Sequence, residues 1–266
     1  MPAYTPRRCL SRRILGCLLY VGAHNTMPLP PPPPNWEANE ISKFFDAARV
    51  NEFATFANLT GEVARLSDID IGYRKAIDGL NHSKDWFAGF FLLRAHSNFL
   101  AACRLCWSAQ IPESYALLRS CLENALYGLY LAKHPESRET WLRRHDDAAA
   151  KQKVKDEFKI GTMLNLAAAV DATEGAVAKL LYERTIDSGA HPNELALMQT
   201  LQINENVDHI EFKSNYLDQD STALRAALKT TAQVGVCALS LFRVIYPERF
   251  NIMGVTDLLR HVKAGL

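Results

Sequence analysis

The most constraining feature of this sequence is a pair of long segments, residues 86–109 and 114–132, that carry almost no charge. Helices with so little polar surface pack against other helices over most of their circumference. Their few charged residues include Arg94, Arg104, Arg119 and Glu123. The short turn between them contains Pro112, which suits the first turn of a helix. We therefore expect two antiparallel helices at the centre of a bundle.

Sequence periodicity predicts further helices before this pair. Apolar residues recur at steps of three and four in residues 44–59, which predicts a first helix whose aromatic stripe, including Phe53 and Phe56, faces the core. Residues 62–80 predict a second helix that is interrupted around Gly72.

The later part of the chain also reads as helical. Residues 134–161 mix both signs of charge, which indicates a solvated helix with local ion pairs. Residues 162–186 predict a helix with a break at 171–175, and residues 222–246 predict a last long helix that Pro247 ends. The expected fold is therefore all-α.

These segments together predict a single helical bundle of about six to seven helices over residues 36–266. A small β-hairpin is the one exception, near residues 200–215. A chain of 266 residues is large enough to bury such a core without disulfide bonds or a structural metal.

Residues 1–35 are predicted to lie outside this domain. The proline run at residues 28–34 is typical of an extended spacer. A cluster of arginines precedes an apolar run at residues 14–21 that is too short to cross a bilayer. Residues 1–26 lie upstream of a true start at Met27, form a disordered basic tail, or are an export signal. We favour the first interpretation, and with it a cytoplasmic protein.

The charge balance excludes a strong overall electrostatic field. Lys and Arg number 30 against 29 Asp and Glu, for a net charge of +1. Such a chain has no general attraction for nucleic acid or for an anionic membrane, so no membrane partner is expected.

The cysteines have two interpretations. All occur in apolar surroundings, which is typical of reduced core thiols; they are Cys9, Cys17, Cys103, Cys106, Cys121 and Cys237. The alternative is a zinc site, because Cys103 and Cys106 have C-x-x-C spacing and Cys121 and Cys237 complete a set of four. We favour core packing, with no metal and no cofactor.

A few polar residues are candidates for a binding pocket. Arg119 and Glu123 are four residues apart and share a helix face with Tyr127. They form either an architectural ion pair or the wall of a pocket that holds an anion. Asn193, in the turn after His191, is a candidate for the same pocket.

Arg184 and His191 are the candidate catalytic residues. Their spacing, in the run YERTIDSGAHPN, resembles the R-x(4 to 6)-H signature of the HEPN superfamily, which includes metal-independent ribonucleases of bacterial toxin and defence systems. The resemblance implies that His191 is the acid/base residue and that Arg184 contacts the phosphate. A turn histidine whose ring caps a neighbouring helix is the other interpretation of His191.

A broader resemblance covers roughly residues 85–246. The run ESYALLRSCLE, the later YLA, the charged segment around Trp141 and the turn GAHPN resemble uncharacterised bacterial helical families. This resemblance implies an all-helical fold and a bacterial origin, and no activity.

Three functions therefore remain. The favoured one is a non-catalytic interaction or regulatory protein of bacterial stress or defence that acts through helical surfaces, with a homodimer as one arrangement. The second is an HEPN-like ribonuclease that uses Arg184 and His191, and it alone implies RNA as a partner. The third is a metal-binding bundle built on the cysteines.

Overall fold

A computed structural model describes residues 31–266, apart from 81–82, 84, 193, 206–208 and 218–221. The predictions for residues 1–30, which include Cys9, Cys17 and a start at Met27, lie outside the described residues.

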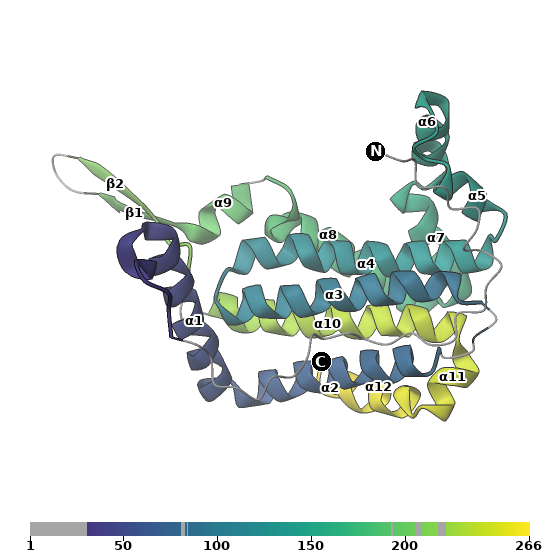
Figure 1. Cartoon of the computed structure of the whole chain (residues 1–266), viewed down its shortest axis with the longest axis horizontal. Coiled ribbons are helices and arrows are strands. Elements are labelled where there is room, and N and C mark those ends of the chain that lie inside the picture. Colours follow the sequence, from purple (N-terminus) through teal and green to yellow (C-terminus); the bar gives the residue numbers. More distant parts are fainter. Residues whose placement is uncertain (1–30, 81–82, 84, 193, 206–208, 218–221) are drawn as a thin grey trace.

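Three long helices form the centre of the molecule: α3 (Phe87–Trp107), α4 (Ile111–Lys133) and α10 (Thr222–Ile245). They lie side by side along the long axis in Figure 1 and pack against one another. Ala109 makes the tight turn between α3 and α4 with a φ of 65°, and Pro112 occupies the first turn of α4. The predicted central helix pair is confirmed.

Shorter helices cover this centre. On one side lie α2 (Thr60–Asp78) and α12 (Val255–Lys263), with α11 (Pro247–Ile252) between α10 and α12 in the chain. On the other side, α7 (Ile160–Val170) and α8 (Ala172–Thr185) pack along α4. The all-α prediction is largely confirmed.

The helix count was predicted too low, because the helices run to α12. The charged segment divides into α5 (Ser137–Leu142) and α6 (Ala148–Glu157). The Asp147 side chain accepts from the backbone N–H of Ala150 and so starts α6. Asp171 does the same for Glu174 at the start of α8, which is the predicted break. Two further helices, α11 and α12, follow Pro247.

The prediction that α2 is interrupted around Gly72 was wrong. The helix is continuous, and Gly72 is buried within it. A Cβ at Gly72 would lie 3.2 Å from side-chain carbons of Leu239 and Leu258, so the glycine lets α2 approach α10 and α12 closely. The close packing of α2 against its neighbours, and not a break in the helix, explains the glycine at this position.

The prediction that the aromatic stripe of the first helix faces the core was also wrong. In α1 (Glu40–Asn58), Phe45, Phe53 and Phe56 are all exposed. Of the predicted stripe, Ala48 is buried against the bundle, and the Phe56 ring lies 6.1 Å from that of Trp107 on α3 while it stays largely exposed. Figure 1 shows α1 projecting at one end of the molecule.

The small hairpin is confirmed. Strand β1 (Leu201–Glu205) pairs antiparallel with β2 (Ile210–Ser214), with Ile203 opposite Phe212. It follows α9 (Glu194–Thr200) and projects from the same end as α1 (Figure 1). Two short elements complete the described fold, the 3-10 turn η2 (Trp36–Ala38) and the π-helical turn η3 (Ile186–Ala190).

Helix α10 is, within the described ranges, the one helix long and apolar enough to cross a membrane by length and composition. Most of it is buried by the surrounding helices. A central core helix meets the same criteria, so this finding is weak evidence for a membrane span.

Candidate functional site

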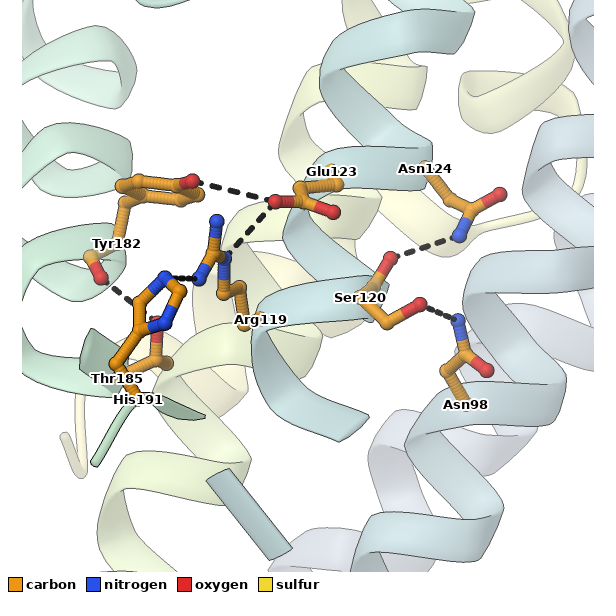
Figure 2. A network of polar contacts seen from close by, with 8 residues as sticks. All are labelled: Asn98, Arg119, Ser120, Glu123, Asn124, Tyr182, Thr185 and His191. Atoms are coloured by element: carbon orange, nitrogen blue, oxygen red, sulfur yellow. Dashed lines mark hydrogen bonds and ion pairs between the residues drawn. The ribbon is translucent and has the colours of Figure 1, made fainter. Parts of the chain in front are cut away.

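Polar side chains meet where α4 faces α8 (Figure 2). The Arg119 Nε donates to Glu123 Oε1 at 2.9 Å, and the Tyr182 hydroxyl donates to the same oxygen at 3.2 Å. The Arg119 guanidinium also lies over the Tyr182 ring, 5.1 Å from its centroid. Glu123 therefore organises the network, since both groups converge on one carboxylate oxygen.

The network perturbs the titration of its members. Burial alone would lower the pKa of Arg119, but the hydrogen bond and the charge of Glu123 raise it. Burial raises the pKa of Tyr182, and the Glu123 charge raises it further. Arg119 therefore stays charged and Tyr182 stays a hydrogen-bond donor.

His191 joins this network from the turn after η3. Its Nε2 contacts Nη1 of Arg119. A guanidinium N–H can only donate, so Nε2 of His191 is the acceptor in this contact. The ring itself is exposed. An exposed imidazole thus lies against the Arg119 guanidinium, although sequence spacing had paired His191 with Arg184.

One hydrogen bond between α3 and α4, and another within α4, lie beside this network. The amide of Asn98 donates to the hydroxyl of Ser120 at 2.8 Å, and the amide of Asn124 donates to the backbone carbonyl of Ser120 at 2.7 Å. Ser120 directly follows Arg119. These bonds hold in place the helix face that carries Arg119 and Glu123.

The other predicted pocket residues lie apart from this network or outside the description. Tyr127 stacks between two aromatic rings, with centroids 6.2 Å from Phe91 and 5.5 Å from Phe158. Asn193 lies outside the described residues. Arg94 is exposed, and Arg104 pairs with Glu52 of α1 at 3.1 Å. The central helices thus contribute only Arg119 and Glu123 to the network.

Arg184 meets a different partner from His191. Its Nη1 donates to Oε1 of Gln233 on α10 at 2.7 Å. Beside this pair is a cavity of about 560 Å³, which Lys229 also lines. Sequence reasoning missed Lys229 and Gln233, although their spacing of four residues places them on one face of α10.

No family model, curated protein or solved structure matches this chain. The function therefore has to be argued from the geometry of these groups.

The four cysteines within the described residues are core residues. Cys103, Cys106, Cys121 and Cys237 are buried free thiols. Cys106 bonds to the hydroxyls of Ser114 and Thr231, and Cys121 lies 3.5 Å from the Tyr73 hydroxyl. Burial raises the pKa of Cys121 to about 12, which disfavours the thiolate that binds metal. Among the described residues, no group of three or more His, Cys, Asp or Glu side chains is arranged to hold a metal ion.

Proposed function

We propose that this chain is a non-catalytic interaction protein that associates with a second copy of itself through α1. The proposal rests on the exposed aromatic side chains of that helix. Phe45, Phe53 and Phe56 are 50%, 63% and 60% exposed. Ile41 and Val50 of the same helix are also exposed, by 67% and 61%. Several large apolar side chains exposed on one helix are typical of an interaction site.

The opposite face of α1 explains why the aromatic side is left uncovered. Asn51 and Thr55 are buried there, and their side chains donate to the backbone carbonyls of Ser108 and Trp107 at 3.2 and 2.8 Å. Those carbonyls lie at the end of α3 and have no acceptor role within the helix. Because α1 uses its polar side to bind the bundle, its apolar side remains available for a partner.

Charge complementarity favours a second copy as this partner. Asp46 and Arg49 share the exposed side of α1, 3.9 Å apart. In a two-fold symmetric interface the same patch meets itself, so two antiparallel α1 helices can set Asp46 of each near Arg49 of the other. The net charge of +1 adds little repulsion between copies. The projecting hairpin adds exposed Ile203 and Phe212 at the same end of the molecule.

A substitution in this surface tests the proposal. Wild type is expected to be dimeric at micromolar concentration by light scattering after size exclusion, and Phe53→Glu monomeric, because a buried unpaired charge is costly. The control is Ile252→Glu on α11, where the side chain is 82% exposed and far from α1, and it is expected to remain dimeric. A monomeric wild type, or a dimeric Phe53→Glu protein, contradicts the proposal.

We further propose a cytoplasmic location and a regulatory role in bacterial stress or defence. Four buried free thiols support a reducing compartment. The stress or defence role rests on the sequence resemblance.

A second candidate function is a metal-independent ribonuclease, as the HEPN resemblance implies. The contact of His191 with Arg119 favours it, because an imidazole beside a guanidinium suits proton transfer from a 2′-hydroxyl and stabilisation of the phosphate charge. In this candidate Arg119 takes the role that the resemblance assigns to Arg184.

Expression in bacteria separates this candidate from the first. If the chain is a ribonuclease, wild type is expected to arrest growth and to cleave RNA in the presence of a chelator, whereas His191→Ala does neither. His261→Ala, an exposed histidine on α12, is the matched control and is expected to behave as wild type. Equal behaviour of wild type and His191→Ala removes the ribonuclease candidate.

A further inference from the structure

A cavity of about 560 Å³ lies between the N-terminal parts of α4 and α10 and the end of α8. Its volume is in the range of small-molecule sites. The apolar part of its wall comes from Ile111, Ala223 and Ala226. The starts of two long helices also contribute partial positive charge at this place.

The charged and amide groups of the cavity are hydrogen-bond donors. Arg184 gives one N–H to Oε1 of Gln233, which leaves the amide nitrogen of Gln233 as a donor. Lys229 is exposed at the wall and has no ion-pair partner within the described part of the chain. No Asp or Glu is among the described residues of the wall. The described part of the wall therefore has an excess of positive charge and of donors.

Hydroxyl groups line its inner side. Tyr115, Ser188 and Thr230 are buried there. Burial raises the pKa of Tyr115, so its hydroxyl keeps its proton. These uncharged hydroxyl groups can form hydrogen bonds with a ligand that Arg184 and Lys229 bind through its charge.

We infer that this cavity binds a small phosphorylated molecule, with its phosphate between Arg184 and Lys229 and its organic part against Ala223 and Ala226. A planar guanidinium and an ammonium group are the usual ligands of phosphate oxygens. The cavity is much larger than a phosphate ion, so the apolar wall has room for the rest of an ester. The site is independent of α1 and of His191.

Calorimetric titration of the full chain with phenyl phosphate tests the inference. Wild type is expected to bind it at micromolar to millimolar concentration. Arg184→Gln and Lys229→Gln are each expected to weaken binding roughly tenfold, because each removes a charge-assisted hydrogen bond. The controls are Lys151→Gln on the exposed side of α6 and His191→Ala, and both are expected to bind as wild type.

A variant that keeps both Arg184 and Lys229 tests where the organic part of the ligand binds. Ala226→Phe fills the cavity from an exposed position, so it is expected to fold and to exclude phenyl phosphate. Lys229 is likewise exposed, so loss of binding in Lys229→Gln does not reflect unfolding. Absence of binding to wild type, or equal binding by wild type and both charge variants, overturns the inference. Unchanged binding by Ala226→Phe overturns the assigned location.

Discussion

Replacing Gly189 with alanine is expected to lower the free energy of unfolding by about 3 kcal/mol or more. Gly189 has a φ of 140°, a conformation that side chains with a Cβ rarely adopt. A Cβ there would lie 2.5 Å from the carbonyl oxygen of Pro112 and 2.8 Å from its Cα. The clash involves backbone on both sides, so no side-chain rotation can relieve it.

Two other glycines separate the effect of the positive φ from the effect of the steric clash. Gly254 also has a positive φ, 69°, but a Cβ would meet nothing within 4 Å, so Gly254→Ala is expected to lose only about 1 kcal/mol. Gly61 is helical and open, so Gly61→Ala is expected to leave stability unchanged or slightly higher. Chemical denaturation measures the free energy of unfolding of all three variants. It is done at one protein concentration, since the stability of a dimer depends on concentration. A Gly189→Ala loss no larger than that of Gly254→Ala contradicts the backbone clash.

The same position connects the two candidate sites. Gly189 lies between Arg184, which lines the cavity, and His191, which contacts Arg119. The close approach of η3 to Pro112 therefore positions the turn that carries His191 and also Ser188, which lines the cavity. Gly189→Ala is expected to weaken phenyl phosphate binding as well as stability, whereas Gly254→Ala affects stability alone.

The central helices were predictable because their signals are local. Low charge over two long segments, with a short proline-containing turn between them, leaves packing side by side as the main solution. The breaks at Asp171 and Pro247 were predictable for the same reason, since a capping side chain and a proline act on their own helix.

The orientation of α1 was not predictable from periodicity. A helical period identifies an apolar face but does not say whether the bundle or another molecule covers it. The signal that was present lies on the other face, where Asn51 and Thr55 bind the carbonyls at the end of α3. Their role depends on how α1 packs against α3 in three dimensions. The spacing of residues along the chain carries no information about that packing.

The candidate site was predictable only within single helices. The spacing of four residues between Arg119 and Glu123 predicted their contact. The contacts of His191 with Arg119 and of Arg184 with Gln233 join residues far apart in the chain. The first depends on the path of η3, and the second on the packing of α8 against α10. A spacing motif cannot report such contacts.

Phe99→Ala is expected to cost about 3–5 kcal/mol of unfolding free energy, because it leaves a cavity at the centre of the bundle. Phe99 is fully buried on α3, where its ring fills the space left by Gly235 on α10. A Cβ on Gly235 would lie 2.6 Å from Cε2 of Phe99. The matched control is Phe90→Ala on the same helix, where the ring is 44% exposed and the expected loss is about 1 kcal/mol.

A double substitution tests whether Phe99 and Gly235 act as a pair. Gly235→Ala alone is expected to cost about 1–3 kcal/mol, because the added methyl group overfills the core. Combined with Phe99→Leu, which removes the ring atoms that the methyl group would meet, it is expected to cost less than the sum of the two single changes. The difference measures the fit between α3 and α10. Strict additivity would mean that Ile69, whose Cγ2 would lie 2.8 Å from the same Cβ, and not Phe99 limits the approach of α10 to the rest of the core.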